Sequence, residues 1–411
     1  MARPALEVAD LLRRFLPQYR QRYGLSPDQA RVAAALLACR TAVLGGHVQV
    51  CDACGERQIS YNSCRDRHCP KCQAAATAQW LERERAYLLP VPYSHVVFTL
   101  PHTLAPLALQ NPRVCYGLLF QAASQTLLEM AADSRHLGAR LGFVAILHTW
   151  GQTLLHHPHL HCLVPAGGLS LDERRWIACR RGFFLPVRVL GALFRATYLA
   201  LLEKSFQAGT LRFHGRLAAL AEPAAFARLL KQVRRQTWVV YAKAPFGGPE
   251  TVLKYLARYT HRIAIANSRL LAVRERAVIF RYKDYRQGKR LRQMRLEPCE
   301  FLRRFLLHVL PRGFVRIRRY GLLANAQREK HLARCRTLLG AAPPAPAESK
   351  PAEPGPGEAA GQDAGVDYED GTALAPRCRA CGEGRLRTLK LLPALRGHGR
   401  WSRAPPLPRC A

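Results

Sequence analysis

The fold is decided by residues 142–164, which read GFVAILHTWGQTLLHHPHLHCLV. Two apolar segments, residues 142–150 and 159–164, flank a polar turn, and this pattern predicts two β-strands. Because alternate side chains of a strand share one face, His159 and His161 should project together while Leu160 points into the core. Two imidazoles on one face can hold a divalent cation and leave positions open for substrate oxygens.

Firm metal binding requires a third protein ligand, for which the sequence offers two candidates. His148 lies on the preceding strand, and Gln152 lies across the turn. We favour Gln152, since an amide oxygen suits Mg²⁺ or Mn²⁺. A His-x-His pair alone is more often a pair of surface or core histidines. Four histidines within residues 156–161, flanked by apolar strand residues in a basic chain, favour the metal site.

A second candidate motif is PETVLKYLARYTHR, residues 249–262, whose good helix formers follow a Gly-Gly-Pro start. In a helix, residues four apart share a face, so the hydroxyls of Tyr255 and Tyr259 should lie side by side. A phenolate can attack a phosphodiester and hold the 5′ end covalently. The alternative is that both tyrosines simply bridge core and solvent. Three nearby cations can bind phosphate or lower a phenol pKa: Lys254, Arg258 and Arg262.

Cysteines are concentrated before the predicted strands. Two Cys-x-x-Cys pairs lie within residues 51–72, and two such pairs complete a tetrahedral zinc shell. The predicted ligands are Cys51, Cys54, Cys69 and Cys72. Three further residues can form part of a second site or replace one of these: Cys64, His68 and His47. Basic residues between the pairs favour contact with DNA, although a purely structural module fits equally well: Arg57, Arg65, Arg67 and Lys71.

The charge balance points to a polyanionic partner. The 411 residues include 63 Lys and Arg against 28 Asp and Glu, a net charge of +35. Such an excess is typical of nucleic-acid binding, with a ribosome-associated protein as the plain alternative. The chain contains no apolar run of about 18 residues, the length needed to span a membrane, and its start lacks an export signal. We therefore expect a cytoplasmic, nucleoid-associated protein whose 14 cysteines are reduced thiols or metal ligands.

The chain divides by composition into five predicted segments. We expect a helical segment over residues 1–40, a zinc-binding, DNA-contacting domain over 41–90 and an α+β domain over 91–340. Residues 341–376, rich in Pro, Ala, Gly and acidic side chains, are predicted to be a disordered linker. The tail, residues 377–411, matches no pattern, and its cysteines, Cys378, Cys381 and Cys410, are not expected to bind zinc.

The order of these motifs resembles the HUH endonucleases, and specifically the two-tyrosine transposases of bacterial insertion sequence family ninety-one. The resemblance spans roughly residues 40–335. It rests on LGGH (44–47) with the cysteine cluster, FTLPH (98–102), HTWGQ (148–152), HPHLH (157–161), YAKAPFGGP (241–249), YLARYTHR (255–262), FRYKDY (280–285) and LLHVLP (306–311).

The resemblance implies an antiparallel sheet with flanking helices, the His-x-His pair on a central strand and the tyrosine helix alongside. It implies that His159 and His161 bind a catalytic Mg²⁺ or Mn²⁺ and that Tyr255 and Tyr259 are nucleophiles. The implied activity is rolling-circle transposition, in which one strand is nicked, held as a 5′-phosphotyrosine, displaced and joined to a target. No GxxxxGK[ST] loop is present, so displacement would need a host helicase and replication proteins.

Three other functions are compatible with parts of this pattern. A plasmid or phage rolling-circle replication initiator would use the same residues. A non-catalytic zinc-finger binder of nucleic acid would make the histidines and tyrosines structural. A zinc-dependent hydrolase would use the histidines but leave the paired tyrosines unexplained.

Overall fold

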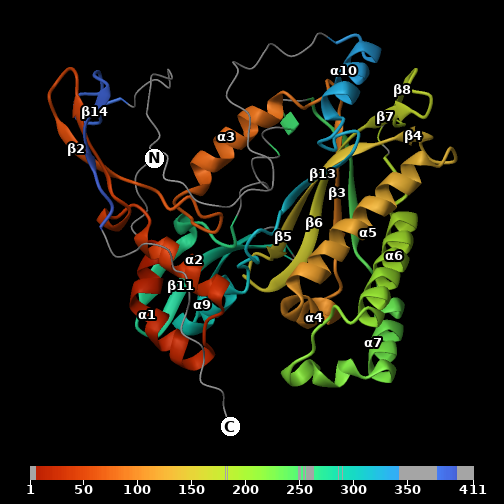
Figure 1. Ribbon diagram of the computed structural model, residues 1–411, viewed down its shortest axis with the longest axis horizontal. Helices are drawn as coiled ribbons and strands as arrows, with labels where there is room; N and C mark the ends of the chain where they lie inside the picture. Colours follow the sequence, from red (N-terminus) through yellow and green to blue (C-terminus); the bar gives the residue numbers. More distant parts are fainter. Residues whose placement is uncertain are drawn as a thin grey trace. The chain divides into compact units, whose positions relative to one another are not determined.

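The computed structural model describes residues 6–180, 182, 184–248, 251–252, 255, 263–285, 287–288, 290–341 and 377–395. The chain forms two compact units, each built from two separate stretches (Figure 1). Unit 1 comprises Met1–Ala33 and Asp66–Pro343, and unit 2 comprises Ala34–Arg65 and Pro344–Ala411. The predicted linker, residues 341–376, lies outside the described residues except for Ala341.

Unit 1 is organised around a five-stranded sheet with the strand order β13-β5-β6-β3-β9. Every neighbouring pair in this sheet is antiparallel. Its strands are β3 (Tyr93–Thr99), β5 (Gly142–Trp150), β6 (His156–Pro165), β9 (Val240–Phe246) and β13 (Ile317–Gly321). The His-x-His strand, β6, is therefore the middle strand of the sheet, and the α+β fold with an antiparallel sheet is confirmed.

One face of this sheet carries the main hydrophobic core. Strand residues such as Phe98, Leu147 and Leu160 are fully buried there. They pack with α5 (Pro112–Ala132) and α6 (Val187–Gln207), two long helices that run side by side (Figure 1). The predicted inward direction of Leu160 is confirmed, because its side chain belongs to this cluster.

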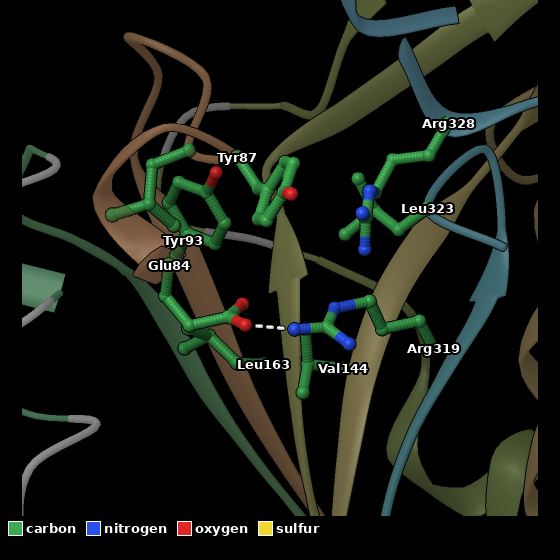
Figure 2. A pocket seen from close by; sticks show the side chains of 9 residues that line it. Glu84, Tyr87, Tyr93, Val144, Leu163, Arg319, Leu323 and Arg328 are labelled. Atoms are coloured by element: carbon green, nitrogen blue, oxygen red, sulfur yellow. Dashed lines mark hydrogen bonds and ion pairs between the residues drawn. The ribbon is translucent and has the colours of Figure 1, made fainter. Parts of the chain in front are cut away.

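The opposite face carries a smaller cluster and the histidines. Tyr93, Val144 and Leu163 lie on this face and pack with Trp80 of α3 (Gln73–Arg85). Figure 2 shows a pocket at this cluster, in which the carboxylate of Glu84 points at the guanidinium of Arg319 and forms an ion pair with it. Because Glu84 balances the Arg319 charge, we assign this pocket to packing between α3 and the sheet.

The other elements of the chain complete the two units. Helices are α1 (Val8–Tyr23), α2 (Pro27–Ala38), α4 (Ala105–Gln110), α7 (Pro223–Arg235), α9 (Pro298–Leu306) and α10 (Arg328–Leu338). Short 3₁₀ turns are Ala42–Leu44, His102–Leu104, Gly215–Ala221 and Asn267–Arg269. One small sheet holds β10 (Leu270–Arg274), β11 (Ala277–Asp284) and β12 (Arg290–Leu296); another holds β4 (Ala139–Arg140), β7 (Gly167–Ser170) and β8 (Trp176–Ala178).

The helical start of the chain follows its sequence signals. The Ser26 N–H donates to Gln29 Oε1 at 3.1 Å, and the Gln29 N–H donates to Ser26 Oγ at 3.2 Å. This reciprocal pair is a capping box, and it fixes where α2 begins. No helix among the described residues is long and apolar enough to cross a membrane.

Unit 2 contains a three-stranded antiparallel sheet with the order β14-β1-β2. Its strands are β1 (Gly46–Cys51), β2 (Arg57–Tyr61) and β14 (Leu386–Leu392). The central strand thus pairs with its sequence neighbour on one side and with a segment near the end of the chain on the other. The tail that matched no sequence pattern supplies an edge strand.

Gly321, at the end of β13, lies in close contact with the backbone of Leu141. Gly321 has φ +59°, and a Cβ there would collide with the carbonyl oxygen of Leu141. Gly313 has φ +76°, but a Cβ there would meet nothing within 4 Å. Both alanine variants carry the left-handed backbone cost of roughly 1–2 kcal/mol. Gly321→Ala should lose about 1–3 kcal/mol more of the free energy of unfolding because of overpacking.

Urea unfolding of the two variants measures this difference. Gly313→Ala serves as the matched control, since it shares the backbone strain without the collision. Equal losses in the two variants would show that the close approach of Gly321 to Leu141 is absent.

Candidate active site

The register of the main sheet brings four histidines onto one face. His159 and His161 stand two positions apart on β6. His148 of β5 pairs directly with His159. His95 of β3 pairs with Leu163, which follows His161 by two residues and lies on the same face of β6. The alternation of side chains along each strand therefore directs all four rings to the same side of the sheet.

Three of these histidines lie close enough together to hold one metal ion. Nitrogen atoms of His148, His159 and His161 all lie within 4.8 Å of one another. The Nε2 atoms of His159 and His161 are 3.1 Å apart. Neighbouring ligands of an octahedral ion with bonds of about 2.1 Å would be ~3.0 Å apart. The donor set and its spacing thus fit a divalent cation.

Gln152, the third ligand that we favoured from the sequence, has a different environment. Its side-chain oxygen accepts the Lys283 N–H at 3.4 Å, and its carbonyl accepts from Arg269 at 2.7 Å. His148, by contrast, is cross-strand to His159 and stands within the cluster. This geometry favours His148 over Gln152, because the strand pairing fixes His148 whereas Gln152 lies in the turn beyond β5.

The His159 ring is oriented and kept neutral by its surroundings. Its Nδ1–H donates to the carbonyl of His157 at 2.6 Å, which leaves the lone pair on Nε2 facing the cluster. Such a bond fixes the tautomer of a metal-ligating histidine. Burial lowers the pKa of His159 to about 4, so the ring is neutral at physiological pH. A neutral imidazole is the form that binds a metal.

His95 connects the histidine cluster to Tyr255, a connection that the sequence did not reveal. His95 Nε2 lies 2.9 Å from His161 Nδ1, and His95 Nδ1 lies 2.7 Å from the Tyr255 hydroxyl. Burial, together with the charge of Lys243, lowers the pKa of His95 to about 4. The available signal was a histidine inside an apolar strand, at alternate spacing from Val97 and Thr99.

Tyr255 also lies beside an aromatic ring and a cation. Its ring centroid is 4.8 Å from that of Phe246, at an interplanar angle of 61°. Lys243 Nζ lies 4.3 Å from the Phe246 centroid and 5.7 Å from the Tyr255 centroid. Lys243 of β9 pairs with His95 of β3, and this pairing places a positive charge next to Tyr255. The sequence analysis did not single out this lysine.

Several predicted residues lie outside the described part of the chain. These are the second tyrosine and three cations: Tyr259, Lys254, Arg258 and Arg262. Their roles remain predictions. Tyr255 itself is helical, as expected for the tyrosine segment.

A buried histidine, His308, packs through Trp150 against His148 of the histidine cluster. His148 stacks on Trp150 with ring centroids 4.6 Å apart, and Trp150 contacts His308 edge-on at 5.9 Å. His308 Nε2 donates to the Leu154 carbonyl at 3.0 Å, and its Nδ1 accepts from the Thr149 hydroxyl at 3.1 Å. Burial lowers the pKa of His308 to about 4. The neutral ring is thereby locked in one tautomer.

The cysteines pair differently from the sequence-based assignment. Cys51 and Cys54 lie in unit 2, where their thiols gather with those of Cys378 and Cys381, all within 4.8 Å. Cys69 and Cys72 belong to unit 1 and stand at the start of α3. In unit 2, the Cys64 N–H donates to Cys39 Sγ at 3.5 Å. Sequence proximity was therefore a poor guide to which Cys-x-x-Cys pairs meet.

His68 is not placed as a zinc ligand, because both ring nitrogens have protein partners. Its Nδ1–H donates to Asp66 Oδ1 at 2.9 Å, and its Nε2 accepts the Leu310 N–H at 3.2 Å. Burial lowers the pKa of His68, consistent with a neutral ring. We therefore correct its predicted metal role to a structural one.

Two of the four basic residues of the cysteine segment that were predicted to contact DNA are engaged with protein partners instead. Arg67 donates to the carbonyls of Pro311 and Phe314. Lys71 forms an ion pair with Glu7 at 2.9 Å, and both side chains are nearly buried. These two residues therefore have structural roles. Arg57 and Arg65 are exposed, and their contact with DNA remains a prediction.

Comparison with known proteins identifies the chain. Two family models match it: a "Transposase zinc-binding domain" over residues 11–100 and a "Putative transposase" domain over residues 142–330. "Putative transposase y4qJ" of Sinorhizobium fredii (strain NBRC 101917 / NGR234) is 54% identical over 399 residues, covering 97% of this chain and 98% of that protein. "Transposase for insertion sequence element IS801" of Pseudomonas savastanoi pv. phaseolicola is 31% identical over 340 residues, covering 79% of this chain and 77% of that protein. No solved structure matches the chain.

These matches define the protein as a transposase, an enzyme that acts on DNA. It belongs to the transposases of insertion sequence family ninety-one, with a zinc-binding domain in its N-terminal part. The zinc-binding domain and the gathered cysteines support structural zinc.

The buried neutral His308 makes stability depend on pH. In the unfolded chain a histidine has a pKa of about 6.5, whereas in the folded chain the His308 pKa is about 4. Between these values the unfolded state binds more protons than the folded state. The stability that the neutral His308 contributes is therefore fully present above about pH 6.5 and declines as the pH falls toward 4. At about pH 5 the loss should reach roughly 2 kcal/mol for this one group.

Thermal unfolding at neutral pH and at about pH 5 measures this loss for wild type and for His308→Gln. The other histidines titrate in both proteins and cancel in the comparison, so the variant should lose less stability on acidification. An identical acid-induced loss in the two proteins would contradict a depressed pKa for His308.

Proposed function

We propose that this transposase nicks and rejoins single DNA strands through a 5′-phosphotyrosine intermediate and so drives rolling-circle transposition of an insertion sequence. The carrying observation is the continuous line from the Tyr255 hydroxyl through His95 to His161 and His159, with contacts of 2.7, 2.9 and 3.1 Å. This line supports a tyrosine nucleophile next to a metal site. Single-stranded or hairpin ends of the element are the proposed substrates.

The proposed metal ligands are His148, His159 and His161. A bound divalent ion would polarise the scissile phosphate and stabilise negative charge on the departing 3′ oxygen. A set of imidazoles suits a transition-metal ion such as Mn²⁺ better than Mg²⁺, which prefers oxygen donors. The neutral state of His159 means that no proton must be displaced from its Nε2.

His95 is the proposed positioning residue for the nucleophile. If His161 held a metal ion through Nε2, its proton would stand on Nδ1 and form a hydrogen bond to His95 Nε2. A neutral His95 would then carry its own proton on Nδ1 and donate a hydrogen bond to the Tyr255 oxygen. A donor aimed at this oxygen stabilises the phenolate relative to the phenol. Two successive hydrogen bonds, from His161 to His95 and from His95 to Tyr255, thus connect the proposed metal ligand to the proposed nucleophile.

The proposed chemistry is a transesterification. The Tyr255 oxygen, having lost its proton to water, forms a bond to phosphorus. The bond from phosphorus to the 3′ oxygen breaks, and the departing oxygen takes up a proton from water to become a 3′ hydroxyl. Lys243 supplies positive charge beside the attacking ring. In rejoining, a free 3′ hydroxyl attacks the phosphotyrosine and restores the tyrosine. Tyr259 is the proposed second nucleophile, and host helicase and replication proteins are the proposed source of strand displacement.

The covalent intermediate is tested with labelled single-stranded element ends and Mn²⁺ or Mg²⁺ on a denaturing gel. Wild type should give a metal-dependent protein–DNA band that survives denaturation. The Tyr255→Phe/Tyr259→Phe double variant and the His159→Ala/His161→Ala variant should lose it, since they lack the nucleophiles or the metal ligands. Tyr285→Phe, which changes an exposed tyrosine, is the matched control and should keep the band.

Two results would overturn this proposal. One is a covalent band that persists in the double tyrosine variant. The other is a wild type that binds the DNA ends yet never forms the band, which would make this chain a nucleic-acid binder without strand-transfer chemistry.

The positioning role of His95 is tested separately. His95→Leu should lower metal affinity or the rate of covalent complex formation by about 10–100-fold, as is usual for residues that orient a ligand. It should also move the rate–pH profile to higher pH, because the phenolate loses its donor. His95→Asn keeps an N–H near the Nδ1 position and should restore part of the profile. A lower rate with an unchanged pH profile in His95→Leu would reduce His95 to a packing residue.

A further inference from the structure

Unit 2 contains two turns of the same sequence type from opposite ends of the chain. One reads Cys51-Asp-Ala-Cys54-Gly55 and the other Cys378-Arg-Ala-Cys381-Gly382. The Gly55 N–H donates to the Cys51 carbonyl at 3.1 Å, and the Gly382 N–H donates to the Cys378 carbonyl at 3.0 Å. Both glycines are left-handed, with φ +71° and +75°. Each turn is therefore built as a knuckle that presents two thiols on one side.

The sulfur atoms of the two knuckles have the spacing of a zinc–tetrathiolate shell. Cys51 Sγ lies 3.7 Å from Cys381 Sγ, and Cys54 Sγ lies 3.8 Å from Cys378 Sγ. A tetrahedral zinc ion with bonds of about 2.3 Å holds its sulfurs ~3.8 Å apart. All four sulfurs lie within 4.8 Å of one another, so the donor set fits zinc.

Backbone donors surround the sulfurs in the way that stabilises thiolates. The N–H groups of Ala53 and Cys54 point at Cys51 Sγ, at 3.4 and 3.5 Å. The Gly384 N–H points at Cys381 Sγ at 3.4 Å. A Cβ on Gly384 would collide with Cys51 Sγ, so this position has no room for a side chain. Hydrogen bonds to an anionic sulfur favour the deprotonated form that binds metal.

The same end of the sheet joins the two knuckles through the backbone. The Asp52 N–H donates to the Arg385 carbonyl at 3.0 Å, and the Arg385 N–H donates to Asp52 Oδ1 at 2.7 Å. From there β14 pairs with β1, running from Leu386 opposite Cys51 to Leu392 opposite Gly46. The four thiols thus stand at one end of the β1–β14 ladder.

We propose that Cys51, Cys54, Cys378 and Cys381 form one structural zinc site whose ligands come from both ends of the chain. The matching zinc-binding domain covers residues 11–100 and so includes only the first pair. The C-terminal segment, residues 377–395, is then an integral part of unit 2: it contributes half of the zinc ligands and an edge strand. A chain that ends before Cys378 lacks two of the four ligands and forfeits this zinc ion.

Zinc content of the purified full-length chain tests this assignment. Cys51→Ser/Cys54→Ser and Cys378→Ser/Cys381→Ser should each lose one equivalent of zinc per chain, measured by mass spectrometry of the metal. The quadruple variant should lose no more than either pair, because all four thiols share one ion. Cys179→Ser/Cys335→Ser removes two thiols of unit 1 and is the matched control. The assignment is overturned if the Cys378/Cys381 variant retains wild-type zinc or if the quadruple variant loses an additional equivalent.

Wild type provides a second test that needs no folded variant. Thiol alkylation at rising chelator concentration is followed by peptide mass spectrometry. The four cysteines should lose protection together, at one chelator concentration, as expected when a single ion is removed. Alkylation of Cys378 and Cys381 without chelator, while Cys51 and Cys54 stay protected, would contradict the shared site.

Discussion

The candidate active site depends on the alternation of side chains along β6, the middle strand of the main sheet. Leu160 and Cys162 are fully buried in the core against the long helices, and this burial fixes which way His159 and His161 face. A slip of one residue in register would send the histidines into the core and the leucine out of it. The same pairing sets His148 beside His159 and brings His95 next to His161. Core packing thereby assembles the histidine cluster.

Burial also determines the chemical state of these rings. The pKa values of His95 and His159 fall to about 4, mainly because of desolvation, so both rings are neutral and each has one lone pair to offer. The carbonyl of His157 fixes the His159 proton on Nδ1. A metal ion bound at Nε2 of His161 would leave the His161 proton on Nδ1, and His95 would then present its own proton to the Tyr255 oxygen. Unit 2 depends on a different principle. Its buried cluster joins Leu386 to three of the thiols, and the proposed zinc ion takes the place of a large core.

The local sequence pattern predicted secondary-structure elements better than it predicted which distant residues come into contact. The two strands that carry His148 and the His-x-His motif were predicted because their apolar pattern is strong. The sequences of β12 and β13, RLRQMRL and IRRYG, are rich in arginine and lack such a pattern, so they give no clear strand signal. The role of His95 depends on the β3–β6 register, which local sequence does not contain. Likewise, the meeting of Cys51 with Cys381 depends on β1–β14 pairing across 330 positions, and the buried partners of His68 and Lys71 are equally non-local.

The central claim is that His148, His159 and His161 together bind the metal that serves Tyr255. Anomalous X-ray diffraction from crystals of the full-length protein grown with Mn²⁺ tests this claim most directly. The account predicts one manganese peak bonded to the three imidazoles, on the sheet face that carries His95 and Tyr255. Manganese bound elsewhere in unit 1, with the three imidazoles left unligated, would contradict it.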